Sequence, residues 1–186
     1  TQKIKLGKLM ALDRLWLTAI AERYNTSHDN LTELVRRVDT VPPSLALAQA
    51  AEESGWGTSR FVLEGNALFG QWTYATENSL VPAKRDPGRK HRVKAFAKLI
   101  DAVRAYMRNL NTHRAYRPLR LERQVMRQQG VGLSGLKLAK TLTPYSERGQ
   151  QYVRSIQAII LTNKLDSLDN ARLGGEKVSV NAKPII

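Results

Sequence analysis

One helical segment in the first third of the chain constrains the fold most. Residues 45–54 read LALAQAAEES, a run rich in alanine, which is the best helix former. Prolines precede the run, and Gly55 and Gly57 follow it, where glycine commonly ends a helix. A helix that is apolar on nearly every side is usually buried at the centre of a domain. We therefore expect the rest of the chain to pack around residues 45–54, with Ser44 as their N-cap.

The composition agrees with a single folded domain. The chain has 186 residues, of which 42% are hydrophobic, too many for a chain that stays disordered. It has no cysteine, which excludes disulfide scaffolds, thiolate metal sites and cysteine nucleophiles. No stretch approaches the roughly 18 consecutive apolar residues of a transmembrane helix.

The pattern of apolar residues predicts mostly helix with one small β region. Helical periodicity occurs over residues 9–24, 31–38, 98–111, 115–129, 134–142 and 147–163. It disappears between residues 69 and 96, where 71–74 and 92–96 alternate like the strands of a hairpin or three-stranded lobe. We predict a leader over 1–9, one domain over 10–168 and a tail over 169–186.

Two adjacent carboxylates, Glu52 and Glu53, close the predicted buried helix. The negative end of the helix dipole, partial burial and repulsion between neighbours would each favour the protonated form and raise a carboxyl pKa. A carboxylic acid that stays protonated near neutral pH is what glycoside cleavage needs to protonate its leaving oxygen. Successive helical residues point about 100° apart, so the two side chains face different surroundings, with Glu53 beside Gln49. A frayed, solvated helix end is the competing interpretation.

Four ordered segments resemble the bacterial peptidoglycan-hydrolysing N-acetylglucosaminidases. They are AQAAEESGWG at 48–57, GNALFG at 65–70, YMRNLNTHRAY at 106–116 and LTPYSERG at 142–149. The last two are similar to the Bax-type branch of that family in particular, and the resemblance runs from about residue 10 to residue 165. It implies a mainly α (α+β), lysozyme-like fold, with a helical lobe, a small β-lobe and a cleft between them. It also implies that the catalytic acid is the Glu before Ser-Gly-Trp-Gly, which is Glu53, while Glu52 flanks or tunes the site.

The resemblance implies a second catalytic group less directly. Family members carry a carboxylate on the β-lobe some way after the acid, which points to Asp86, with Glu77 as the alternative. An inverting mechanism would use this group to activate water, with the carboxyls roughly 6.5–9.5 Å apart. If the substrate's own N-acetyl group attacks instead, no second carboxylate is needed. Asp86 also lies in an Asp-Pro-Gly turn, which is a sufficient reason for an aspartate there.

The resemblance also suggests groups that bind the substrate. Tyr145 matches the family's tyrosine on the helical side of the cleft, where a phenol could bond the acetamido group or the acid. Tyr152 would match if the gap were placed differently, although we favour a core position on the last helix for it. Further residues predicted to bind substrate are Trp56, Phe69, Trp72 and Asn66. The three histidines lack metal-ligand spacing, and we predict no metal and no cofactor.

Charge separates the two parts of the sequence. The chain carries 30 Lys and Arg against 16 Asp and Glu, a net charge of +14. Residues 1–64 are neutral, while 84–127 hold 14 basic and three acidic residues. Arginines recur at helical intervals after residue 100, which is typical of a solvated face. We expect this half to bind an anionic partner, and the resemblance points to peptidoglycan strands and an anionic wall surface, with the protein periplasmic or secreted.

Two alternative functions remain at this stage. A muramidase or lytic transglycosylase could use the same fold and a single Glu. A basic helical nucleic-acid binder would explain the charge, but the chain has no recognisable nucleic-acid-binding motif, and we expect no nucleic acid partner.

Overall fold

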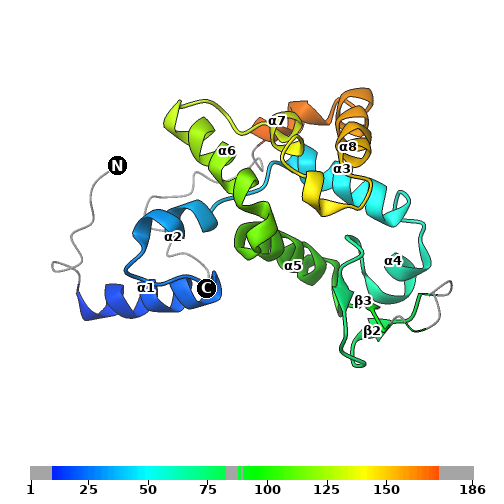
Figure 1. Cartoon of the computed structure of the whole chain (residues 1–186), viewed down its shortest axis with the longest axis horizontal. Coiled ribbons are helices and arrows are strands. Elements are labelled where there is room, and N and C mark those ends of the chain that lie inside the picture. Colours follow the sequence, from blue (N-terminus) through cyan, green and yellow to red (C-terminus); the bar gives the residue numbers. More distant parts are fainter. Residues whose placement is uncertain (1–9, 83–87, 89, 172–186) are drawn as a thin grey trace.

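The computed structural model describes residues 10–82, 88 and 90–171. These form a helical body with a small β-lobe at one side (Figure 1). The helices are α1 (Ala11–Arg23), α2 (Leu31–Arg37), α3 (Pro43–Ser54), α4 (Arg60–Gly65), α5 (Leu99–Thr112), α6 (Arg117–Gln128), α7 (Gly135–Ala139) and α8 (Gln150–Thr162). Short 3₁₀ turns are η2 (Arg114–Tyr116), η3 (Thr143–Tyr145) and η4 (Leu165–Asn170). The mainly α, lysozyme-like fold predicted from the sequence is confirmed.

Helix α3 occupies the centre of the body, as its composition predicts. Leu45 and Ala48 are fully buried, and α3 packs against α7, α8 and η4. The first turn of α7 approaches so closely that a Cβ added to Gly135 would lie 2.1 Å from the Ser44 Oγ. Only glycine fits at this crossing, and a larger residue would push the two helices apart.

The predicted N-cap of α3 is wrong. The helix begins two residues earlier, at Pro43, because the fixed φ of proline suits the first helical position. Ser44 therefore lies inside the helix, and its buried hydroxyl has no hydrogen-bond partner among the described residues. The carboxylate of Asp169 caps the helix instead, accepting from the backbone N–H of Ser44 at 3.0 Å and of Gly135 at 2.8 Å. Since Asp169 lies in η4, the packed part of the chain continues to Asn170.

The β-lobe contains a three-stranded antiparallel sheet. Its strands are β1 (Trp72–Thr73), β2 (Ser79–Leu80) and β3 (Arg92–Lys94), in the order β1-β3-β2. Val93 pairs with Trp72 on one side and Leu80 on the other. This agrees with the strands predicted around residues 71–74 and 92–96, whereas the short helix α4 was not predicted. Helix α4 packs against β2, while Trp72 of β1 and Lys94 of β3 face the helical body.

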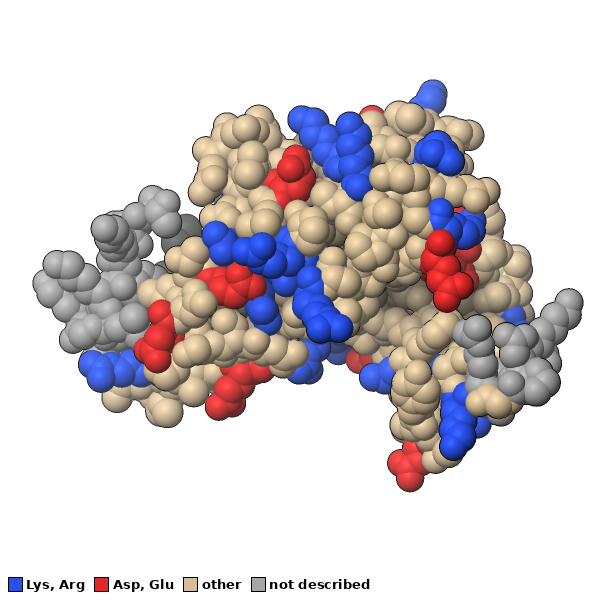
Figure 2. Space-filling view, in the orientation of Figure 1, with Lys and Arg blue, Asp and Glu red and all other residues tan. Residues whose placement is uncertain are grey.

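The arginines after residue 100 do not all lie on a solvated face, which corrects that interpretation. Arg120 and Arg123 on α6 are only 2% and 1% exposed. Arg123 donates to the carbonyls of Arg36 and Thr40 and to Asn111 Oδ1, at 2.7–2.8 Å, and pairs with Asp39. These bonds join α6 to α2 and the loop after it, where Figure 2 shows basic and acidic groups side by side. Two of the positive charges thus stabilise the fold and are unavailable to an external partner.

Replacing Arg123 with Met should lower the free energy of unfolding by about 3 kcal/mol, because three buried acceptors would lose their donor and Asp39 a counter-charge. Arg117→Met, on the exposed face of the same helix, is the matched control and should change stability by about 0.5 kcal/mol or less. Urea unfolding followed by circular dichroism measures both. Equal stability of the two variants would contradict this assignment.

Candidate active site

Glu53 lies on the last turn of α3, and the segment after it explains the Ser-Gly-Trp-Gly sequence. Gly55, Trp56 and Gly57 all have positive φ, so the chain turns left-handed directly after the acid. The Ser54 hydroxyl holds this turn, donating to the Ala50 carbonyl at 2.6 Å and accepting from the Gly57 N–H at 2.7 Å. The turn ends the helix abruptly and leaves the Glu53 side chain at its end.

Glu53 lines a cleft of about 1130 Å³ between the helical body and the β-lobe. Figure 2 shows the hollow between these two parts of the molecule. The β-lobe side is formed by Phe69, Gly70, Gln71, Trp72, His91 and Lys94, and the helical side by Ala105, Arg108, Asn109, Thr112, Tyr116 and residues 144–148. At Gly70 the backbone approaches the acid, since a Cβ there would lie 3.8 Å from Glu53 Oε2. The arrangement places one carboxyl group deep between two walls rich in aromatic and polar groups.

The interior beside Glu53 is a cluster of four tyrosines. The rings of Tyr145 and Tyr152 stack at 5.4 Å, and Tyr116 lies 5.7 Å from Tyr145. Tyr106 is fully buried and stacks on Phe69 at 3.9 Å. Burial raises the pKa of all four phenols, so they remain neutral at physiological pH and act as hydrogen-bond groups.

Tyr152 is buried in the core, as favoured from the sequence, and is also a neighbour of Glu53. Its side chain is completely buried, and its phenol lies close enough to the Glu53 carboxyl to lower the pKa of that group as a hydrogen-bonding neighbour. Tyr145, the tyrosine predicted for the site, lines the cleft beside it. Both tyrosines considered from the sequence, Tyr145 and Tyr152, therefore lie at the site, and their rings stack on each other.

The pKa of Glu53 is raised above its ordinary value, chiefly because burial penalises the charged form. The hydrogen bond from Tyr152 opposes this shift, the negative charge of Glu52 adds to it, and Arg148 opposes it. The direction agrees with the expectation from the sequence. The tertiary structure contributes the two opposing groups, Tyr152 and Arg148, which come from residues about 100 positions away.

Glu52 forms an ion pair with Arg148 across the rim of the cleft. The guanidinium of Arg148 also lies over the Tyr152 ring, 5.4 Å from its centroid. The pair links the end of α3 to the segment that carries Tyr145. Because Glu52 engages Arg148, this cation is held by a neighbour of the acid and not by the acid itself.

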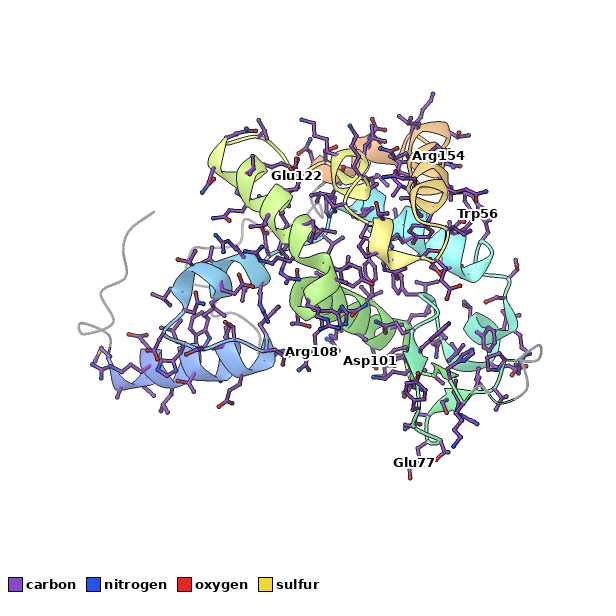
Figure 3. The ribbon with its side chains drawn as sticks, viewed as in Figure 1. Trp56, Glu77, Asp101, Arg108, Glu122 and Arg154 are labelled. Atoms are coloured by element: carbon purple, nitrogen blue, oxygen red, sulfur yellow. The ribbon has the colours of Figure 1, made fainter. Side chains whose placement is uncertain are left out.

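The structure divides the aromatic and amide residues predicted to bind substrate. Phe69 and Trp72 line the cleft; Phe69 is 4% exposed, whereas Trp72 is 60% exposed and stacks on His91 at 4.3 Å. Trp56 does not line it and lies at the outer end of α3 (Figure 3). Asn66 has φ +49° at the end of α4, and its amide donates to the Phe96 carbonyl at 2.9 Å. Its observed role is to hold α4 against the segment leading into α5.

The second carboxylate is less defined. Asp86 lies outside the described residues. Glu77 stands at the tip of the β-lobe, pointing away from the body (Figure 3), and does not line the cleft. Among the described residues, the carboxylates that line the cleft are Glu53 and the exposed Glu147.

Several cleft residues were not predicted from the sequence, including Glu147, His91, Lys94, Arg108 and Asn109. None has a distinctive local pattern, and they meet only because β3, α5 and the loop after η3 converge. Within the described part of the chain, no group of three or more His, Asp or Glu side chains could hold a metal ion. No helix of that part is long and apolar enough to cross a bilayer.

Comparison with known proteins identifies the family. Residues 29–165 match the glucosaminidase family model, described as mannosyl-glycoprotein endo-beta-N-acetylglucosaminidase. The chain belongs to the glucosaminidase family. It is also similar to Protein bax of Escherichia coli (strain K12), with 31% identity over 164 residues that cover 85% of this chain. The match spans 58% of the length of that relative. No solved structure matches the chain significantly.

Membership of the glucosaminidase family indicates a glycoside hydrolase and agrees with the resemblance seen in the four sequence segments. The matched region contains the whole cleft, from the end of α3 to the segment bearing Tyr145. The acid, the tyrosines and the cationic cleft residues therefore all lie in the part of the chain that defines the family.

The ion pair beside the acid predicts how the pKa of Glu53 responds to substitution. Glu52→Gln removes a negative neighbour and frees Arg148, so the pKa of Glu53 should fall. Arg148→Gln removes the opposing cation, so the pKa should rise. Carbon-13 NMR titration of labelled glutamate carboxyls measures these shifts. Glu64→Gln, an exposed residue paired with Arg60 outside the cleft, is the control and should leave the pKa of Glu53 unchanged. A rise in the pKa of Glu53 in the Glu52→Gln variant would show that the electrostatic assignment is wrong.

Proposed function

We propose that this protein is a peptidoglycan hydrolase that cleaves the β-1,4 glycosidic bond after N-acetylglucosamine, with Glu53 as the general acid. The observation that carries the proposal is a partly buried carboxyl at the end of α3 that lines a cleft between two lobes, where burial raises its pKa. Family membership supports glycosidase chemistry independently. Such action on the cell wall would place the protein in the periplasm or outside the cell.

The chemistry follows from the environment of Glu53. In the protonated form, its carboxyl donates a proton to the glycosidic oxygen as the bond to the anomeric carbon breaks. Burial keeps the proton on the acid near neutral pH, while the Tyr152 hydroxyl stabilises the carboxylate that forms after transfer. A water molecule then completes hydrolysis at the anomeric carbon.

The attack on the anomeric carbon has two routes. In one, water attacks directly and a carboxylate on the β-lobe acts as its base, for which Asp86 stays the predicted group. In the other, the substrate's own acetamido oxygen bonds to the anomeric carbon as the glycosidic bond breaks, water then opens the ring so formed, and the protein must orient that amide. The neutral Tyr145 hydroxyl and Asn109, both in the cleft lining, are suitable to orient an acetamido group.

The charge of the cleft favours an anionic glycan over a neutral one. Lys94 on β3 and Arg108 on α5 line the cleft from opposite lobes, and neither forms an ion pair with another described residue. Unpaired cations in a binding cleft attract carboxylates. Peptidoglycan supplies these on its peptide stems, and on lactyl groups that carry no stem, whereas chitin-like oligomers carry none.

Replacing Glu53 with Gln should reduce hydrolysis of purified peptidoglycan by at least a hundredfold, because the amide cannot donate the proton. Glu64→Gln, the same substitution outside the cleft, should retain full activity. Mass spectrometry of the products identifies the bond: reducing-end N-acetylglucosamine is expected. Reducing-end muramic acid would indicate a muramidase, and anhydro-muramic ends a lytic transglycosylase. Full activity of Glu53→Gln would exclude Glu53 as the acid.

Binding of the inactive Glu53→Gln protein to purified cell walls should weaken as salt rises, because exposed charges are screened within about 8–10 Å at physiological ionic strength. Adding Lys94→Gln and Arg108→Gln should weaken binding of soluble, stem-bearing glycan fragments as well. Arg114→Gln with Arg117→Gln, which are exposed outside the cleft, should reduce adsorption to walls only. Co-sedimentation and calorimetry measure the two effects. Salt-independent adsorption, or tight DNA binding without wall binding, would contradict the assigned partner.

A further inference from the structure

Gln49 is a buried polar residue whose position the proposed function does not yet use. It lies one turn before Glu53 on the same face of α3 and has no exposed surface. A primary amide in a helical core is costly unless every polar atom is paired. Gln49 does not line the cleft, so it cannot bind substrate directly.

Both ends of the Gln49 amide are bonded to tyrosines. The Tyr106 hydroxyl donates to Gln49 Oε1 at 2.7 Å, and Gln49 Nε2 donates to the Tyr152 hydroxyl at 2.8 Å. The Tyr152 phenol is in turn a neighbour of the Glu53 carboxyl, whose pKa it lowers. Two hydrogen bonds therefore run from α5 through α3 to α8 and end at the phenol beside Glu53.

The direction of each of these bonds follows from the number of protons available. A tyrosine hydroxyl has one proton to donate. Since the Tyr152 oxygen accepts from the Gln49 amide, its own proton stays free for the Glu53 carboxylate. If the amide were reversed, Gln49 Oε1 would accept the hydrogen bond of the Tyr152 hydroxyl. Tyr152 could then only accept a hydrogen bond from a protonated Glu53. The orientation of one amide thus decides which ionisation state of the acid Tyr152 stabilises.

Tyr106 explains why the amide keeps this orientation. Its ring is held by stacking on Phe69, and its hydroxyl is directed at Gln49 Oε1. With Oε1 engaged by that donor, Nε2 is left for Tyr152.

We propose that Gln49 is a positioning residue, which fixes the Tyr152 hydroxyl as a hydrogen-bond donor to the Glu53 carboxylate. The proposal rests on the role of Glu53 as general acid. Without Gln49, the Tyr152 hydroxyl can turn away or accept a hydrogen bond from the protonated acid, so the carboxylate formed on proton transfer loses a fixed donor. Gln49 thereby limits how far burial raises the pKa of Glu53 and strengthens it as an acid.

Other titratable groups also face Glu53. They are Glu52 on the same helix, Arg148 beside α8, Tyr106 on α5, Tyr116 on η2 and Tyr145 on η3. The four tyrosines, Tyr152 included, stay neutral over the working pH range, because burial raises their pKa. Glu52 and Arg148 are paired with each other, and a substitution at Gln49 leaves that pair intact.

The test compares Gln49→Leu, Tyr152→Phe and the double variant. Each single change should move the alkaline limb of the pH–rate profile to higher pH, because activity is lost as pH rises through the pKa of Glu53. Each should lower kcat about five- to tenfold, the effect of losing one hydrogen bond, with KM unchanged. Because Gln49 acts through Tyr152, the double variant should match Tyr152→Phe alone. Carbon-13 NMR titration should show a higher Glu53 pKa in each single variant than in the unmodified protein, and the double variant should match Tyr152→Phe.

Two results would overturn the proposal. One is an unshifted Glu53 pKa in a folded Gln49→Leu protein, which would leave Gln49 a structural role only. The other is a change in kcat and in the Glu53 pKa on Gln49→Leu that is equally large with and without the Tyr152 hydroxyl. Tyr106→Phe provides the test if Gln49→Leu does not fold: loss of the donor to Oε1 should shift the Glu53 pKa in the same direction. Because the NMR titration needs no activity, it separates failure of this proposal from failure of the proposed function, which an active Glu53→Gln enzyme would show.

Discussion

The burial of α3 is the constraint on which the rest of the structure depends. Its small side chains allow α7, α8 and η4 to pack against it closely, to the point where only glycine fits opposite Ser44. The same burial takes Glu53 out of water at the end of the helix and raises its pKa. Stability and chemistry therefore have one physical origin, since the contacts that form the core also set the protonation of the acid.

A buried acid is useful only if its conjugate base can form when the proton leaves. Around Glu53, groups that favour the neutral form and groups that favour the carboxylate oppose one another. Burial and Glu52 act in the first direction, while Tyr152 and Arg148 act in the second. Glu52 holds Arg148, and Gln49 bonds Tyr152, so each opposing group has its own partner within α3. The helix thus carries the acid together with two residues that contact the groups tuning it.

The positive charge of the chain has more than one use. Arg120 and Arg123 are buried, and Arg123 joins α6 to the region of α2 by hydrogen bonds to backbone carbonyls. Lys94 and Arg108 line the cleft, and Arg114 and Arg117 are exposed elsewhere. The net charge of +14 therefore includes arginines that stabilise the fold as well as the cations that we assign to binding an anionic glycan. Counting charges along the sequence could not separate these roles, because arginine has the same helical spacing whether it faces water or carbonyl groups.

The central helix, the change to strands after residue 69, the family and the position of Glu53 could all be predicted from the residues in order. These follow from local causes: alanine content, glycine after the helix, alternation of side chains, and a contiguous motif whose serine and glycines form the turn after the acid. The fold was needed to show that Tyr152 is a neighbour of Glu53, that Asp169 caps α3, and that Trp56 and Asn66 lie outside the cleft lining. Each of these depends on residues far apart in the chain, or on a backbone direction set by packing. A local sequence pattern does not show such distant contacts or backbone directions. Helix and strand periods specify which face of an element is buried, but not which partner covers it.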